Sequence, residues 1–98
     1  MKKIEGIKKK LKEVEPLLKE RFKIKKIGIF GSYIRGEQKR KSDLDILVEF
    51  VEEPGLFEFI ELEDCLSKNL GLKVDLVMKS ALKPTIGKYI LNEVVYIP

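Results

Sequence analysis

An alternating run over residues 43–51 constrains the fold of this chain more than any other segment. Successive side chains of a strand leave opposite faces of its sheet. The apolar side chains would share one face (Leu44, Ile46, Val48 and Phe50), and the other face would carry Asp43, Asp45, Leu47 and Glu49. The run therefore predicts a strand with Asp43 and Asp45 on one face, at the end of the strand nearest a Gly-Ser turn.

Helical and strand periodicities account for most of the remaining chain. Pro16 should kink the first helix or restart it, and Gly28 inside a strand indicates the close approach of another backbone or a ligand. We expect helices over residues 3–22, 56–70 and about 84–93, and one helical turn over 32–36. We expect strands over residues 25–30, 43–51, 72–78 and, as a short edge strand, 94–97.

Apolar side chains at three- and four-residue spacing define the inner faces of the two long helices. In the first helix they are Ile4, Ile7, Leu11, Val14, Leu17 or Leu18, and Phe22. In the helix over 56–70 the side chains on or near the inner face are Leu56, Phe59, Ile60, Leu62, Cys65, Leu66 and Leu70. We expect Ser32 to be the N-cap of the short turn, and Gly36 and Gly71 to end their helices.

Composition excludes several classes of protein. The chain has 98 residues, of which 44% are hydrophobic and 37% charged, so we expect one folded domain over 1–98 with a modest core. No apolar run approaches the roughly 18–20 residues that span a bilayer. The single cysteine, Cys65, excludes an internal disulfide, and the lack of histidine excludes a Cys/His zinc cluster. We therefore expect a cytoplasmic protein without membrane association.

The net charge of +4 comes mostly from lysines within residues 2–26 and 39–41. It fits either a solvated surface or affinity for an anion such as a nucleotide or RNA. We favour the solvated surface, so direct nucleic-acid binding is an open alternative and not the expectation.

Three aspartates could form a metal site. Asp43 and Asp45 would leave one strand face about 7 Å apart, and paired carboxylates suit Mg²⁺ when a nucleotide supplies further oxygen ligands. Two such ions can activate an attacking oxygen and stabilise departing pyrophosphate. Asp75 lies in an otherwise apolar strand, where a carboxylate is costly to bury unless it is paired or metal-bound. If the two strands are neighbours, Asp75 completes a triad; the alternative is an edge position facing water.

A phosphate-binding turn could precede these aspartates. Gly31-Ser32 would allow close backbone approach, and its N–H groups could hold phosphate oxygens, although a simple capped turn would look the same. Arg35 could reach a triphosphate or pair with Glu37, and both alternatives stay open. The charged loop over 37–41, with Lys39, Arg40 and Lys41, is expected to be solvated rather than to contact a ligand.

These residues together resemble a known signature. Gly31-Ser32, Asp43-x-Asp45 and a later strand aspartate at Asp75 are similar to the DNA polymerase β-like nucleotidyltransferase superfamily, and FGSYIRGEQKRKSDLDILVEF resembles its minimal nucleotidyltransferase (MNT) branch. The resemblance covers about residues 22–97 and has no departure at the Gly-Ser or aspartate positions. It implies an α/β (α+β) fold, with a small mixed sheet of three to four strands covered by helices.

The resemblance also implies an activity. Asp43, Asp45 and Asp75 would be the catalytic metal ligands, and Gly31 and Ser32, with Arg35 as a further candidate, would bind the nucleotide. The expected cofactor is Mg²⁺, two ions by analogy, with ATP as substrate. Members of this branch are antitoxins paired with HEPN-family toxins, to which they transfer AMP, so we expect a HEPN-type partner and either a hetero-oligomer or a homodimer.

The sequence fits three functions. The first is Mg²⁺-dependent transfer of AMP to a hydroxyl, expected to be a tyrosine, of a HEPN toxin. The second is a stoichiometric antitoxin that binds its partner without catalysis. The third is nucleotidyl transfer to RNA or a small molecule. We favour the first, because the aspartate set is complete and the chain is too short for a separate acceptor-binding domain.

Overall fold

A four-stranded mixed sheet forms the centre of the computed structural model, which describes residues 4–98. Its strand order is β3 (Val74–Met78), β2 (Leu44–Phe50), β1 (Ile24–Phe30) and β4 (Val95–Tyr96). β1 is antiparallel to both β2 and β4, whereas β2 and β3 are parallel. The expected α+β fold with a small mixed sheet is therefore confirmed.

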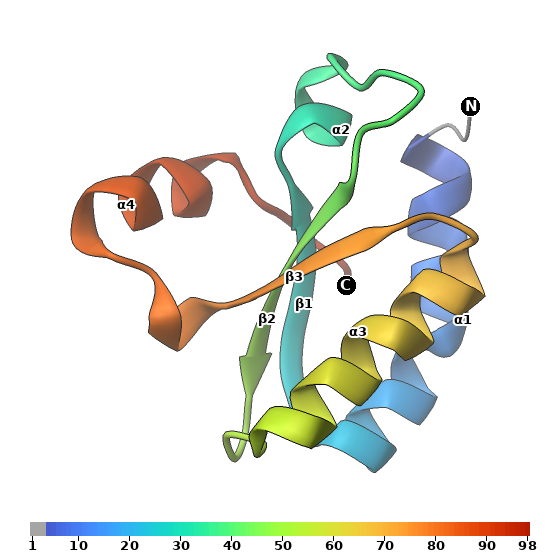
Figure 1. Ribbon diagram of the computed structural model, residues 1–98, viewed down its shortest axis with the longest axis vertical. Coiled ribbons are helices and arrows are strands. Elements are labelled where there is room, and N and C mark those ends of the chain that lie inside the picture. Colours follow the sequence, from blue (N-terminus) through green and yellow to red (C-terminus); the bar gives the residue numbers. More distant parts are fainter. Residues whose placement is uncertain (1–3) are drawn as a thin grey trace.

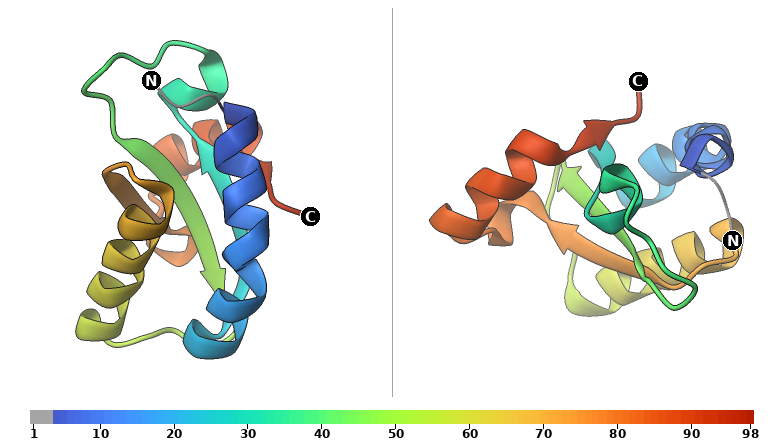
Figure 2. Two further views of the ribbon diagram at one scale, coloured as in Figure 1. Left: turned by 90° about the vertical axis from the view of Figure 1, so that its right-hand side faces the viewer. Right: turned by 90° about the horizontal axis from the view of Figure 1, so that it is seen from above.

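Helices lie on both sides of this sheet. The long helices α1 (Ile4–Phe22) and α3 (Leu56–Leu70) cover one face, and α4 (Pro84–Glu93) stands on the other side (Figures 1 and 2). Two short elements complete the chain, namely α2 (Ser32–Arg35) after β1 and a 3-10 turn, η1 (Lys79–Ala81), after β3. No helix within residues 4–98 is long and apolar enough to cross a membrane.

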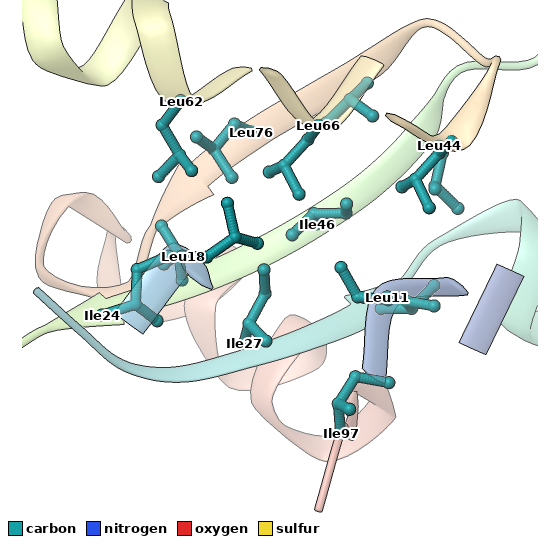
Figure 3. Packing of buried hydrophobic residues seen from close by; sticks show 14 of the residues in the cluster. Leu11, Leu18, Ile24, Ile27, Leu44, Ile46, Leu62, Leu66, Leu76 and Ile97 are labelled. Carbon is teal, nitrogen blue, oxygen red and sulfur yellow. The ribbon is translucent and has the colours of Figure 1, made fainter. Parts of the chain in front are cut away.

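The hydrophobic core lies between the sheet and the two long helices (Figure 3). Leu11 and Leu18 of α1 and Leu62 and Leu66 of α3 are buried there against the strands. On β2 the core side chains are Leu44, Ile46 and Val48. The alternation predicted for this strand is confirmed, and it places the aspartates on the sheet face away from α1 and α3.

Some predicted helical details are wrong. α1 runs through Pro16 without a break, so the restart is excluded; residue 3 lies outside the described range. Leu18 is buried and Leu17 is exposed. Leu56 and Ile60 were expected on or near the inner face of their helix, but they are exposed. The buried stripe of α3 is Leu62, Leu66 and Leu70, at four-residue spacing, and Ile60 is rotated by about 120° around the helix from the middle of this stripe.

The boundaries around the short turn also differ from the prediction. Gly31 is the N-cap of α2, with φ 80° and ψ −154°, so Ser32 is the first helical residue and makes no capping hydrogen bond. The expected strands over 25–30, 43–51, 72–78 and 94–97 are all present with ends shifted by up to two residues. The close approach at Gly28 is confirmed, because a Cβ there would lie 3.0 Å from the Val95 carbonyl oxygen of β4.

Candidate active site

Parallel pairing of β2 and β3 brings two of the predicted aspartates side by side. Asp45 and Asp75 are register partners, and neighbouring strands lie about 4.8 Å apart. Asp43, which directly precedes β2, projects from the same face as Asp45. Asp75 belongs to an edge strand and is exposed, as in the water-facing alternative, yet it faces Asp45. The sheet therefore gathers three carboxylates at one end of its open face.

The electrostatics of Asp45 reflect this crowding. Partial burial, the neighbouring charge of Asp75 and then that of Asp43 raise the pKa of Asp45 from 3.8 to about 6, and Arg35 opposes the shift. Like charges held together disfavour ionisation. A divalent cation between them would relieve the repulsion, so the donor set fits Mg²⁺, a hard ion that prefers carboxylate oxygens.

The carboxylates do not form a closed cage. Among the residues that the structure describes, no three acidic, cysteine or histidine side chains already converge as a complete metal site. Mg²⁺ is usually held by one or two carboxylates, with water and substrate phosphates supplying its other ligands. An open set of aspartates is therefore compatible with a metal that binds together with a nucleotide.

The Gly-Ser turn packs directly on Asp45. Phe30, the last residue of β1, pairs with Asp45 across the sheet, so Gly31 follows at the level of the carboxylate. A Cβ on Gly31 would lie 2.9 Å from Asp45 Cγ and would overlap the carboxylate oxygen. The positive φ of Gly31 is a second reason for glycine here. Ser32 and Tyr33 follow in the first turn of α2, where N–H groups have no acceptor within the helix.

A fourth carboxylate, Glu93, was not predicted from the sequence. One oxygen accepts the Gly31 N–H at 2.8 Å, and the other is 2.7 Å from Arg35 Nη1. The bond from Arg35 lowers the pKa of Glu93. One available signal was its position in the last turn of a helix, where an acidic side chain opposes the helix dipole and needs a compensating partner.

Arg35 is held by two carboxylates. Its Nε lies 2.7 Å from Glu37 Oε1, in addition to the contact with Glu93. These bonds, that to Glu37 first, raise its pKa. The pairing of Arg35 with Glu37 that the sequence allowed is thus present, and Arg35 also lies close enough to Asp45 to influence its ionisation. Lys39, Arg40 and Lys41 are exposed in the loop that follows.

Comparisons with known proteins identify relatives of this chain. The nucleotidyltransferase domain family model matches residues 11–97. The protein adenylyltransferase MntA of Thermococcus cleftensis is 55% identical over 94 residues, which is 89% of this chain and 95% of the relative. A Methanocaldococcus jannaschii protein, provisionally named a protein adenylyltransferase, is 54% identical over 98 residues, covering 99% of this chain and all of its own length.

Solved structures of toxin–antitoxin complexes have the same fold. A chain from a toxin–antitoxin crystal structure with AMP-PNP has a TM-score of 0.76 and 28% identity, covering 91% of this chain and 72% of that chain. A chain from a mutant MntA–HpeT toxin–antitoxin structure has a TM-score of 0.75 and 25% identity, covering 88% and 70%.

Fold, site and comparisons together define an enzyme class, the nucleotidyltransferases. This chain belongs to the nucleotidyltransferase domain family. Its resemblance to the minimal nucleotidyltransferases, inferred from the Gly-Ser and aspartate positions, is confirmed by relatives that span nearly its whole length.

Proposed function

We propose that this chain transfers AMP from ATP, with Mg²⁺, to a hydroxyl of a HEPN-family toxin, a tyrosine by preference, and so acts as an antitoxin. The observation that carries the proposal is the register pairing of Asp45 with Asp75 beside Gly31. The names of the relatives and the toxin–antitoxin structures support the donor and the partner. The proposal includes the cytoplasmic location expected from the cysteine content.

Each site residue has a distinct part in this reaction. Asp43, Asp45 and Asp75 would hold Mg²⁺, which neutralises phosphate charge and stabilises the leaving pyrophosphate. Gly31 and Ser32 would position the triphosphate through the backbone and the Ser32 hydroxyl. Arg35 would contact phosphate through the N–H groups not bonded to Glu37 and Glu93.

In the proposed reaction Asp75 would accept the proton. The acceptor oxygen forms a bond to the α-phosphorus, and the bond from this phosphorus to the oxygen that bridges to the β-phosphate breaks. Pyrophosphate leaves, and the hydroxyl proton passes to the Asp75 carboxylate, which is exposed and therefore accessible to an incoming protein.

The test uses the HEPN-family protein of the same genome as acceptor. Both proteins are incubated with ATP and Mg²⁺, and the intact mass of the acceptor is measured. We expect a gain of one or more AMP units, abolished by Asp43→Asn and by Asp45→Asn, and retained by Asp64→Asn, which replaces an exposed aspartate paired with Lys68. An unmodified acceptor with active enzyme, or full transfer by Asp43→Asn, would contradict the proposal.

A second candidate is a stoichiometric antitoxin without catalysis. The observation that favours it is the exposure of large apolar side chains on α4, notably Ile86 and Tyr89. In that case the Asp43→Asn and Asp45→Asn variants would still neutralise the toxin, whereas loss of neutralisation by both variants would exclude this candidate.

A further inference from the structure

Helix α4 is attached to the rest of the chain at few points. Gly87 is its only buried residue, and a Cβ there would lie 3.0 Å from Leu82 Cβ. At its end, Glu93 bonds Gly31, and the following Val94 packs beside Gly28. Ile86 and Tyr89 are 61% and 74% exposed, although large apolar side chains are usually covered.

Two of the three exposed large apolar side chains of α4, Ile86 and Tyr89, lie on the face of the helix that reaches the active site. Ile86, Tyr89 and Glu93 are separated by three and four residues, so they share one face of the helix. At about 1.5 Å of rise per residue, Tyr89 lies about 6 Å and Ile86 about 10 Å from Glu93 along the axis. Glu93 itself contacts the Gly-Ser turn. A protein that covers Ile86 and Tyr89 would therefore have its own surface at the active site.

The charges around this face are positive. A groove of about 520 Å³ runs along α4 and is lined by Pro84, Thr85, Lys88, Tyr89 and Asn92. Lys83 directly precedes Pro84 at the start of the helix and lines a second groove together with Lys88. Glu93 is the only acidic residue of α4, and Arg35 neutralises it. The complementary partner surface is apolar at its centre with carboxylates at its rim.

We infer that the α4 face, defined as Ile86 and Tyr89 with Lys83 and Lys88 flanking them, is the docking surface for the protein that accepts AMP. This inference rests on the proposed function and names the surface that this function requires. Docking here would place an acceptor hydroxyl beside the Gly-Ser turn, which Glu93 of α4 contacts.

A second exposed apolar patch cannot serve this purpose. It comprises Val51, Leu56, Phe57 and Ile60, where β2 ends and α3 begins. Asp45 and Val51 are separated by six residues of extended chain, about 20 Å, and Figure 1 shows α2 and the start of α3 at opposite ends of the molecule. A partner bound there would not present a hydroxyl to the aspartates, so this patch provides a matched control.

The experiment compares the double variant Ile86→Ser/Tyr89→Ser with the control Leu56→Ser/Phe57→Ser. Binding of the HEPN-family protein of the same genome is measured by calorimetric titration without ATP, and AMP transfer is measured separately. We expect the α4 variant to bind the acceptor at least tenfold more weakly than wild type does. Its KM for the acceptor should rise by about the same factor. Its kcat at saturating acceptor and its affinity for ATP should change less than twofold, and the control should behave as wild type.

Charge reversal gives an independent variant. Lys83→Glu/Lys88→Glu changes two exposed side chains, so the melting temperature should be retained. Because complementary charges act mainly on association, we expect a slower on-rate and a weaker dependence of binding on salt than in wild type. A Lys9→Glu/Lys12→Glu variant on exposed positions of α1 is the matched control.

The outcomes separate this inference from the proposed function. Unchanged binding by both α4 variants, or a loss confined to the Leu56→Ser/Phe57→Ser control, overturns the docking surface even if AMP transfer proceeds. Binding that depends on the α4 face without any AMP transfer overturns the proposed function and leaves the surface standing. Weaker binding with a raised KM for the acceptor and unchanged ATP affinity supports both.

Discussion

At the scale of single residues, Glu93 connects the end of α4 to the Gly-Ser turn. It accepts the Gly31 N–H and binds Arg35 with its second oxygen. We expect Glu93→Ala to weaken ATP binding about tenfold, because the turn loses a hydrogen bond to a charged group. Glu93→Gln should be milder, since its amide oxygen can still accept from Gly31. Binding is measured by titration with a non-hydrolysable ATP analogue.

The control for this prediction is Glu37→Ala. It removes the other carboxylate bonded to Arg35 but leaves the Gly31 contact in place. If Glu37→Ala weakens nucleotide binding as much as Glu93→Ala does, then Glu93 acts by positioning Arg35 and not by positioning the Gly-Ser turn. Equal affinity of Glu93→Ala and wild type would contradict both roles.

The raised pKa of Asp45 predicts that its contribution to stability falls as the pH rises, the reverse of what a carboxylate with a lowered pKa would give. Its pKa is about 6 in the folded chain against an ordinary 3.8, so the folded state binds the proton more tightly than the unfolded state does. Above pH 6 the carboxylate is ionised in both states and the full penalty is present; below pH 3.8 it is protonated in both and the penalty disappears. In chelator, we expect Asp45→Asn to be more stable than wild type by about 1–2 kcal/mol at pH 7.5, after allowance for solvent screening.

This difference should vanish as the pH falls towards 4, and denaturant unfolding at several pH values measures it. Asp75→Asn removes a neighbouring charge that raises the pKa of Asp45. In this variant we therefore expect the loss of stability caused by Asp45 ionisation to be complete at a lower pH than in wild type. An Asp45→Asn variant less stable than wild type at pH 7.5 would show that the carboxylate is stabilised in the fold and not strained.

The candidate site was predictable where its chemistry is local in sequence. Asp43 and Asp45 are recognisable as charged residues in an alternating strand, and Asp75 is recognisable as a charged residue in an apolar strand. Their meeting required that β2 and β3 be neighbours, which the sequence allowed but did not establish. Glu93 lies 62 residues from Gly31 along the chain. Hydrophobic periodicity predicts helices and strands but not a hydrogen bond between residues so far apart in the sequence.

At the scale of elements, α3 protects the open edge of the sheet. β3 is an edge strand, and edge N–H groups left unpaired invite association with other chains. Glu63 accepts the Leu76 N–H at 2.9 Å, and the Ser67 hydroxyl accepts the Val74 N–H at 3.1 Å. Side chains of a helix thus take the place of a further strand.

We expect Glu63→Ala to lower the free energy of unfolding by about 1–3 kcal/mol, because the part-buried Leu76 N–H loses its acceptor. Glu63→Gln should lose less, since the amide oxygen can still accept. Asp64→Ala on the same helix removes only an exposed ion pair with Lys68 and should change stability by no more than about 0.5 kcal/mol. Urea unfolding measures all three, and equal losses for Glu63→Ala and Asp64→Ala would contradict the edge-protection argument.

Element boundaries were predictable where glycine or proline marks them. Helix α3 ends before Gly71 and α4 begins at Pro84, both as expected. The errors arose where burial depends on partners that the sequence does not reveal. Leu56 and Ile60 fit an apolar helical pattern, yet α3 buries a different stripe against α1 and the sheet. Ser32 has the chemistry of an N-cap, but packing against Asp45 requires glycine one residue earlier.

At the scale of the whole molecule, the stability provided by one small core must offset the cost of keeping three carboxylates close together. A domain of this size is stabilised by only about 5–15 kcal/mol, so the burial of Asp45 beside the charges of Asp75 and Asp43 is a noticeable cost. A ligand that binds only the folded chain adds RT ln(1 + [L]/Kd) to its stability, about 1.4 kcal/mol at tenfold excess over Kd. Binding of Mg²⁺ with ATP should therefore be visible as a change in global stability.

We expect saturating Mg²⁺ and ATP to raise the melting temperature at pH 7.5 by roughly 5–10 °C, since 1 kcal/mol shifts a domain of this size by about 4–8 °C. The shift should shrink at pH 5, where Asp45 is largely protonated and a metal must displace its proton. Asp43→Asn and Asp75→Asn should lose most of the shift, whereas Asp64→Asn should retain it. A shift that is equal at both pH values and survives in Asp75→Asn would mean that the nucleotide binds without the three aspartates, which would remove the metal site from the proposed mechanism.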